Sequence, residues 1–357
     1  MAVSEVWRAK ARARLDALTK PLGSLGRLED LAAQYVAIRQ EKAIEPMRAA
    51  VCVFAADHGV TAEGVSAYPS EVTRQMVLNF VAGGAAINVL ARLHGVALTV
   101  VDVGVDGEFD GIAGMVHAKV RRGSRNLRRE AALSEEEMTA AMLVGGRMAE
   151  EAASSGCNVV AAGEMGIGNT TTASAIAAAL TGVAAELVTG RGTGVDMAQR
   201  VRKVLVVEES LGVHFGFRSA DRPPSQRRDA GHPVSSAQEI VRCVGGLEIA
   251  AMVGFYLAAA RLGLVIVCDG FIATAAAAVA VGMVPEVAGY LIAGHRSEEP
   301  GHAVLLEHLG LRPVLDLGMR LGEGTGAVLA MPVIASAMAL YWQMATFGSA
   351  GVSEAGA

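Results

Sequence analysis

Short apolar runs that end abruptly at polar residues recur along the chain. The first run covers residues 49–56 and stops at Asp57. Three later runs reach acidic residues in the same way, at Asp102, Glu164 and Asp269. An uninterrupted apolar run of this length is typical of a strand that is buried on both faces of a parallel sheet. The pattern therefore predicts parallel strands with polar residues at their carboxyl ends, where such sheets bind ligands.

Segments with helical spacing of apolar residues separate these runs. Residues 4–42 have this spacing, and an Ala-rich segment follows each strand candidate. The alternation predicts an α/β fold, a Rossmann-like, mostly parallel sheet with helices on both faces. We expect one catalytic unit over residues 1–357, with a large α/β domain at approximately 45–320. Segments at approximately 1–44 and 325–357 are expected to form a smaller helical domain.

Composition narrows the class of protein. The 357 residues are 52% hydrophobic and 4% aromatic, with a net charge of −5, which argues against a nucleic-acid partner. The basic cluster at 119–130 is short, so we interpret it as a solvated or anion-steering loop. Four cysteines without C-x-x-C spacing indicate reduced thiols, and the N-terminus has no apolar signal-peptide core. These features predict a cytoplasmic protein.

One stretch is long enough to span a membrane. Residues 327–353 contain no charged side chain, but Pro332 and several polar residues interrupt the stretch. The apolar stretch 271–284 is too short to span a bilayer. We therefore expect both to be buried core segments of a soluble protein, and a membrane-associated protein is the alternative.

A Gly-rich turn follows the third strand candidate. Gly163 and Gly168 have P-loop spacing, but Asn169 stands where a P-loop has Lys, which disfavours a triphosphate. Thr171 stands where the dinucleotide fingerprint needs Gly or Ala. The start of the following helix can still bind one phosphate, and an ordinary tight turn is the alternative. Glu164 favours a functional turn, because packing gives no reason for an acid there.

Two more Gly-rich turns add candidate chemistry. Residues 189–196 include Arg191, with Lys203 downstream, and a flexible loop is the alternative interpretation. Residues 321–330 place Glu323 between glycines. A carboxylate among apolar residues can have a raised pKa and act as a base, whereas a solvated turn is the alternative. Two such acidic turns suggest one cleft lined by acids and backbone donors.

Other chemistries fit the sequence poorly. His58, His295 and His302 lie near acids, but their spacing matches no strong zinc pattern. A serine hydrolase would need the G-x-S-x-G elbow, which the sequence lacks. We therefore expect no metal site.

The chain resembles the nicotinate-nucleotide–dimethylbenzimidazole phosphoribosyltransferases, which build the nucleotide loop of cobalamin. The resemblance spans residues 15–340. Its signatures occur in the family's order: KPLGSLGRLEDLA, DHGV, YPSEVTRQMVLNF, GEMGIGNTT, GRGTGVD, VGGLEIAAMVG, DGFIATAAA, GHRSEEPGH and LGEGTGA.

The resemblance implies a pentosyltransferase, specifically a phosphoribosyltransferase. Such enzymes move the phosphoribosyl group of nicotinate mononucleotide to 5,6-dimethylbenzimidazole, giving α-ribazole 5′-phosphate and nicotinate. The leaving pyridinium needs little help from an acid, but the attacking azole must lose its N–H proton, so a carboxylate is the natural general base. The resemblance implies no metal and no redox cofactor, two small-molecule substrates and a homodimer.

The resemblance also assigns residues. Glu323 takes the position of the catalytic base, and Glu164 assists or orients. Residues expected at the phosphoribosyl and nicotinate site are Gly166, Gly168, Asn169, Thr170, Gly192, Thr193, Gly194, Lys203, Asp269 and Ser297. Asp269 is expected to face the ribose, and Ser297 the nucleotide. Tyr68, Met76 and Leu321 are expected to contact the benzimidazole.

Two departures leave alternatives open. The segment 212–236 looks longer and more basic than is usual in the family, and we interpret it as an exposed loop. The position matched to Tyr68 varies, so a relative that uses adenine, a phenol or another azole is an alternative. A non-catalytic nucleotide-binding protein is a further alternative, which the presence of Glu323 disfavours.

Overall fold

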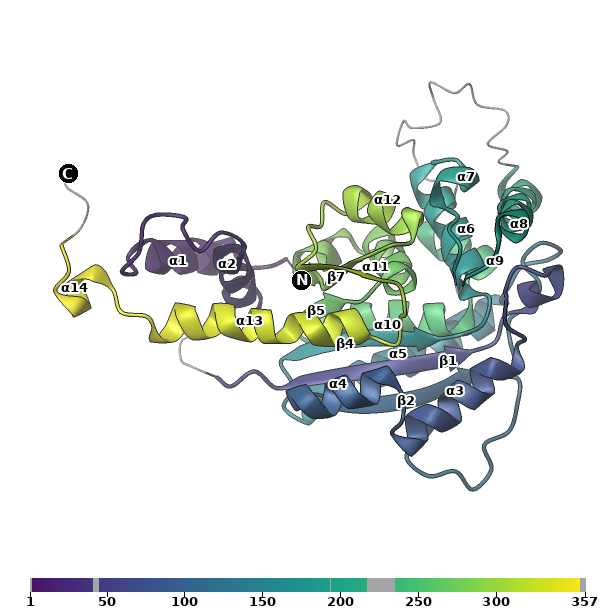
Figure 1. Cartoon of the computed structure of the whole chain (residues 1–357), viewed down its shortest axis with the longest axis horizontal. Coiled ribbons are helices and arrows are strands. Elements are labelled where there is room, and N and C mark those ends of the chain that lie inside the picture. The colour runs from purple at the N-terminus through teal and green to yellow at the C-terminus, as the bar shows by residue number, and fades with distance from the viewer. Residues whose placement is uncertain (1, 41–44, 193, 217–234, 354–357) are drawn as a thin grey trace.

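The chain folds around a six-stranded parallel sheet. The computed structural model describes residues 2–40, 45–192, 194–216 and 235–353 (Figure 1). The strands lie in the order β3-β2-β1-β4-β5-β6. Their bounds are Ala49–Ala56 for β1, Ala97–Gly104 for β2, Val116–His117 for β3, Val159–Met165 for β4, Val265–Cys268 for β5 and Leu291–Ala293 for β6. The predicted fold class is confirmed, because the apolar runs form β1, β2, β4 and β5.

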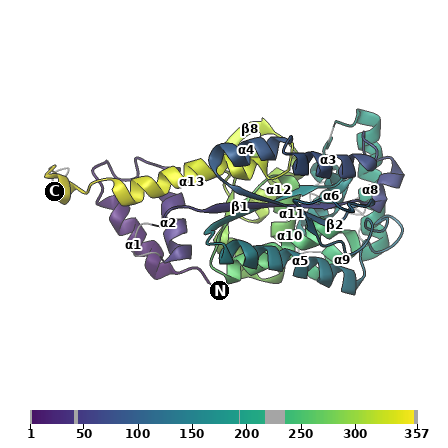
Figure 2. The same ribbon diagram turned by 90° about the horizontal axis from the view of Figure 1, so that it is seen from below.

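Helices connect the strands and cover both faces of the sheet. Figure 2 shows α5 and α10 on one face and α3 and α4 on the other. The helices are α1 (Glu5–Asp16), α2 (Arg27–Arg39), α3 (Glu71–Ala82), α4 (Ala86–His94), α5 (Glu135–Ser154), α6 (Asn169–Thr181), α7 (Ala185–Val188), α8 (Met197–Phe215), α9 (Ala237–Val244), α10 (Leu247–Arg261), α11 (Phe271–Met283), α12 (Pro300–His308), α13 (Thr325–Gln343) and α14 (Phe347–Ala350). The described residues also form the 3₁₀ helices η1 (Gly59–Glu63) and η4 (Pro285–Tyr290).

The strand order reverses between β1 and β4. From β1 the chain moves outward to β2 and β3, and it then returns to the other side of β1 at β4. In an open parallel sheet, the crevice at the carboxyl ends of such neighbouring strands is the usual place for a ligand. Glu164 at the end of β4 and Asp269 just after β5 therefore lie at this edge of the sheet.

A second, two-stranded parallel sheet lies beside this edge. β7 (His295–Ser297) follows β6 almost directly and pairs with β8 (Leu315–Met319). The pairing brings the segment after β6 next to the residues that precede the turn around Glu323. The hydrophobic pattern predicted neither strand.

The N-terminal helices α1 and α2 lie beside the C-terminal helix α13 (Figure 1). The Arg14 guanidinium donates from Nε to the carbonyl oxygen of Tyr341 at 2.8 Å, and the Thr19 N–H donates to Ala345 at 3.0 Å. The N-terminal segment thus packs as two helices, α1 and α2, against the end of α13. The proposed division into a large and a small domain stays a prediction.

Among the described residues, two helical stretches are long and apolar enough to span a membrane by length and composition alone. They cover residues 71–94 and Thr325–Gln343. In the most apolar 18-residue segment of each stretch, 33% and 56% of the residues are buried inside the protein. The first stretch comprises α3 and α4, with Gly83 and Gly84 between them. Buried core helices pass the same test, so these stretches are weak evidence for a membrane.

The prediction of an exposed loop at 212–236 is wrong at its start. Residues 212–215 continue α8, which ends where Gly216 adopts a left-handed φ of 64°. Ser236 caps α9, and its side chain accepts a hydrogen bond from the N–H of Glu239. Residues 217–234 lie outside the described part of the chain.

Candidate active site

A cavity of about 600 Å³ opens at the carboxyl ends of β4, β5 and β6. The predicted residues that line it are Tyr68, Met76, Glu164, Gly166, Asn169, Thr170, Gly192, Asp269, Ser297, Leu321 and Glu323. Gly168, Gly194 and Lys203 do not line it directly, and Thr193 lies outside the described residues. The cavity thus brings together residues from three distant Gly-rich turns.

One end of the cavity has the features of an anion site. Lys203 on α8 is fully buried, and its Nζ donates to the hydroxyl of Thr170 at 2.7 Å. Burial lowers the pKa of Lys203 to about 8, although the nearby Glu299 opposes this change. Thr170 lies in the first turn of α6, whose N-cap Gly168 has a left-handed φ of 97° that favours glycine. A buried cation, a hydroxyl and a helix start together suit a phosphate.

Gly192 is fixed between an acid and a cation that the sequence analysis missed. Its N–H donates to Glu299 Oε1 at 2.8 Å, and its carbonyl accepts from Arg320 Nη1 at 2.7 Å. Glu299 follows β7 and Arg320 follows β8, so only the pairing of these short strands brings them to the same turn. Arg320 directly precedes a Gly-rich turn, which is the one local signal that could have indicated it.

Glu164, near the end of β4, lines the cavity. Its carboxylate is buried and accepts a hydrogen bond from the side-chain amide of Asn169. Burial above all, with the nearby carboxylates of Glu248 and Asp269, raises its pKa to about 8. Near neutral pH this side chain is therefore mainly protonated in the empty site, and it can donate a hydrogen bond.

Glu323 lies next to Glu164 in a strained turn. Its φ of 64° is one of two positive values among the described non-glycine residues. Such a conformation costs energy and often marks a functional site. The flanking Gly322 allows close approach, because a Cβ there would overlap Glu164 Oε1.

The environment of Glu323 suits a base. The side chain is 4% exposed, and Oε2 accepts from the N–H of Ile87 at 3.3 Å, at the start of α4. Burial raises the pKa of Glu323, and the charge of Asp269 adds to this rise, whereas the Ile87 N–H lowers it. The carboxylate thus gains affinity for a proton while one hydrogen bond orients it.

Asp269 anchors the turn that carries Glu323. Its Oδ1 accepts from the N–H groups of Gly326 at 2.7 Å and Ala327 at 3.0 Å, and its Oδ2 accepts from Gly324 at 3.1 Å. The side chain therefore caps α13 while it lines the cavity. Its expected contact with the ribose stays a prediction.

Ser297 is held in place by a neutral histidine. The N–H of Ser297 donates to His302 Nδ1 at 2.9 Å, so the ring proton is on Nε2, which donates to Thr274 at 3.0 Å. Burial lowers the pKa of His302 to about 3, which agrees with a neutral ring. His302 acts here as a structural residue.

His58 and Glu248 form a buried pair beneath the first Gly-rich turn. Their side chains meet at 2.7 Å, and His58 Nδ1 lies 3.2 Å from the Thr172 hydroxyl. Within the described ranges, no group of three His, Cys, Asp or Glu side chains is placed to hold a metal ion. The expected lack of a metal stays a prediction.

The other end of the cavity is apolar. Val72 and Met76 from α3 line it together with Leu321, which lies two residues before Glu323. Tyr68 and Leu321 are 52% and 57% exposed, so this end is open to solvent. The arrangement suits a flat, mainly apolar ring that lies with one edge toward a carboxylate.

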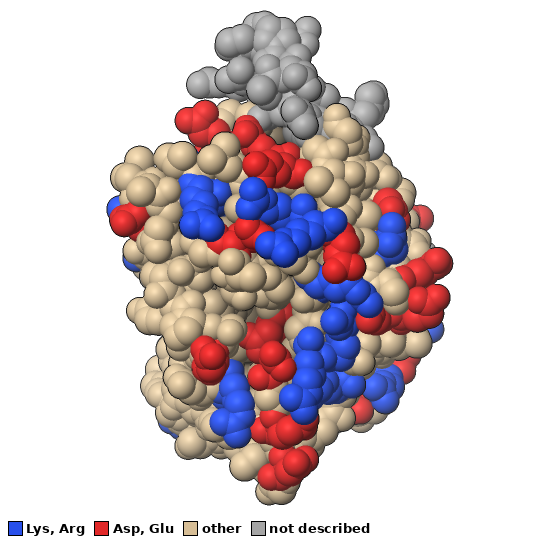
Figure 3. Space-filling view, turned by 90° about the vertical axis from the view of Figure 1, so that its right-hand side faces the viewer, with Lys and Arg blue, Asp and Glu red and all other residues tan. Residues whose placement is uncertain are grey.

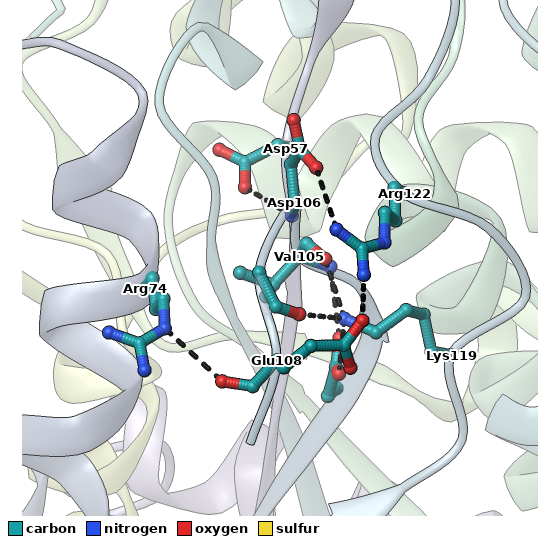
Figure 4. A network of polar contacts seen from close by, with 9 residues as sticks. Asp57, Arg74, Val105, Asp106, Glu108, Lys119 and Arg122 are labelled. Atoms are coloured by element: carbon teal, nitrogen blue, oxygen red, sulfur yellow. Dashed lines mark hydrogen bonds and ion pairs between the residues drawn. The ribbon is translucent and has the colours of Figure 1, made fainter. Parts of the chain in front are cut away.

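A polar network ties α3 to the turn after β2 (Figure 4). Lys119 Nζ donates to the carbonyl oxygens of Val105 at 2.6 Å and Gly107 at 2.7 Å, and Arg74 Nε donates to that of Glu108 at 3.2 Å. Arg122 pairs with the Glu108 carboxylate. The network fixes the helix that carries Met76.

The basic cluster at 119–130 is largely neutralised. Arg128 pairs with Glu63 and Glu209, and Arg125 pairs with Glu137. Figure 3 shows a band of Lys and Arg on this side of the molecule, with Asp and Glu next to it. The surface is therefore a set of ion pairs more than a positive patch.

Comparison with known proteins identifies the class. The sequence model of a family described as phosphoribosyltransferase matches residues 1–352. The chain therefore belongs to this phosphoribosyltransferase family, as its sequence signatures predicted.

Individual relatives are more specific. Proteins from Chromobacterium violaceum and Desulforudis audaxviator are 50% and 49% identical to this chain. Each alignment covers 97% of this chain, and the two alignments cover 96% and 93% of the respective relative. Both are named nicotinate-nucleotide–dimethylbenzimidazole phosphoribosyltransferase. The crystal structure of CobT from Thermus thermophilus matches with a TM-score of 0.89 and 48% identity, over 98% of this chain and 100% of that one.

Proposed function

We propose that this chain transfers the phosphoribosyl group of nicotinate mononucleotide to 5,6-dimethylbenzimidazole. The products are α-ribazole 5′-phosphate and nicotinate. The observation that carries the proposal is Glu323, a strained and buried carboxylate in a cavity that apolar side chains and the start of α6 also line. The names of the relatives, which are about half identical over nearly the whole chain, support the same reaction.

The proposed step is a substitution at C1′ of the ribose. The lone pair of one azole nitrogen forms the new bond to C1′ while the C1′–pyridinium bond breaks and its electrons neutralise the leaving nitrogen. The other azole nitrogen loses its proton to the Glu323 carboxylate. The raised pKa of Glu323 strengthens it as a base for this transfer.

The remaining residues position the donor. Lys203 and Thr170 bind the 5′-phosphate, whose negative charge further stabilises the protonated form of the buried lysine. Glu164 in its protonated form orients the ribose without adding charge beside Glu323. Holding both reactants in one cavity supplies much of the rate enhancement.

The second candidate function is the same phosphoribosyl transfer to a different acceptor base. The observation that favours it is the exposure of Tyr68 and Leu321, because an open acceptor end imposes few limits on ring size. Adenine, phenols and other azoles are the acceptors to compare. A homodimer and a cytoplasmic location remain parts of the proposal.

The test is an assay of the purified chain with nicotinate mononucleotide and a panel of acceptors. We expect nicotinate and α-ribazole 5′-phosphate in equal amounts with dimethylbenzimidazole, measured by chromatography. Faster turnover with adenine or a phenol would favour the second candidate. No nicotinate release with any acceptor would overturn the proposed function.

A further inference from the structure

One buried histidine in the cavity wall has no role in the step described above. His295 in β7 is 1% exposed and lines the cavity, and neither ring nitrogen has a hydrogen-bond partner among the described residues. The nearest acid, Asp269, lies 3.7 Å from Nε2, and three backbone N–H groups already occupy its oxygens. Leaving a buried N–H unpaired is unfavourable, so a ligand group is the expected partner.

Packing holds the His295 ring in place. A Cβ at Gly326 would overlap the ring carbons, so the first turn of α13 lies directly against the imidazole. A Cβ at Gly270 would lie 3.2 Å from Nε2. Because the backbone at Gly326 and Gly270 packs closely against the ring, the imidazole has little room to rotate toward another hydrogen-bond partner.

The start of α11 opens into the same part of the cavity. Phe271, Ile272 and Ala273 line it and are the first three residues of the helix, whose N–H groups lack partners within the helix. The N-cap Gly270 has no side chain to cap them, and no described residue accepts from them. Three free N–H groups at the start of a 13-residue helix favour an anion.

This second anion-binding region differs from the phosphate end in its residues. The phosphate end consists of Thr170, Gly192 and Lys203, whereas this region consists of His295 and the start of α11. The proposed donor has two anionic groups, the 5′-phosphate and the ring carboxylate. A cavity with two such regions therefore suits nicotinate mononucleotide better than nicotinamide mononucleotide, whose ring carries an uncharged amide in place of the carboxylate.

We propose that His295 and the first N–H groups of α11 bind the carboxylate of the nicotinate ring and thereby select the acid over the amide donor. This inference rests on the proposed function. The contacts hold the leaving group before and after the C1′–N bond breaks, so the same residues bind the released nicotinate.

The test compares nicotinate mononucleotide with nicotinamide mononucleotide, which differ only at this group. His295→Leu removes both ring nitrogens at similar size. We expect kcat/KM for the nicotinate donor to fall about 10- to 100-fold, the effect of one lost hydrogen bond to a charged group, while the value for the amide donor changes little. His295→Gln keeps an N–H donor and should restore part of the loss. His308→Gln, at an exposed position on α12, is the control.

An equal loss with both donors would overturn the inference, because His295 would then serve the ribose or phosphate that the donors share. Unchanged selectivity in both variants would also overturn it. If the variants fail to fold, wild-type protein decides the matter by calorimetry with free nicotinate and nicotinamide. We expect at least about 10-fold tighter binding of nicotinate, and equal affinities would contradict the inference. Both ligands test this region even if the wild type transfers no phosphoribosyl group.

Discussion

Two buried ionisable side chains, Glu164 in the cavity and Lys203 beside it, have a pKa that burial shifts from the ordinary value. Lys203 and Glu164 both have a pKa of about 8, although one is a base with a lowered value and the other an acid with a raised value. Burial disfavours the charged form of each side chain, because a buried charge loses its hydration.

Lys203 gives the first prediction at this scale. Lys203→Met keeps the apolar stem and removes the charge, so kcat/KM for the nicotinate donor should fall about 10- to 100-fold. Unfolding in urea without substrate should show equal or greater stability than wild type, because an unpaired buried charge is lost. Arg202→Met on the exposed side of α8 is the control. A variant that loses stability but binds donor normally would contradict the role in phosphate binding.

Glu164 gives a prediction about pH. Its folded-state pKa of about 8 exceeds the ordinary value of 4.5, so between these values the folded state binds more protons than the unfolded state. Stability must then decrease as pH rises through this window, by up to about 1.4 kcal/mol per pH unit from this group. Glu164→Gln removes that contribution, and urea unfolding from pH 5 to 9 should show a stability difference between variant and wild type that grows with pH. A difference that is independent of pH would show that Glu164 titrates normally.

At the scale of elements, the turn between β8 and α13 depends on its neighbours. Asp269 after β5 caps the start of α13, and a Cβ at Gly163 in β4 would overlap the backbone of Glu323. The position of the proposed base is therefore determined by contacts of the sheet with the helix start, not by the turn alone.

Asp269→Asn tests this dependence. One carboxylate oxygen becomes an N–H₂ donor that faces backbone N–H groups, so the variant should lose about 1–3 kcal/mol of stability for each acceptor lost. The turnover rate should also fall, because Glu323 loses its fixed geometry. Asp316→Asn on β8, where the side chain is 65% exposed, is the control. A stable variant with unchanged turnover would contradict the anchoring role, as measured by urea unfolding and steady-state kinetics.

At the scale of the whole molecule, the sequence predicted the sheet better than it predicted the cavity wall. β1 and β4 were predictable because they are buried on both faces and end at polar residues. β6 and β7 have three residues each and follow η4 without a turn pattern that would separate them. Strands so short bury too few residues to show a hydrophobic period.

The same reason explains which site residues were found. Glu164 and Glu323 stand out as acids within Gly-rich turns, whereas His295, Glu299 and Arg320 reach the cavity only through the pairing of β7 with β8. His295 was noted in the sequence only as a poor metal ligand. Its position beside the start of α11 depends on the tertiary fold, which local spacing does not show.

The central claim is that Glu323 is the general base. It belongs to the scale of the whole molecule, because contacts from β4, from the residue after β5 and from the start of α13 together hold this carboxylate in place. Single-turnover kinetics of Glu323→Gln with nicotinate mononucleotide and dimethylbenzimidazole tests it most directly, with Glu307→Gln on the exposed side of α12 as control. We expect wild-type and control proteins to form α-ribazole 5′-phosphate, and Glu323→Gln to be slower by about 100- to 10,000-fold with little change in donor affinity. A variant that reacts within a few-fold of the wild-type rate would contradict the assignment of Glu323 as the base.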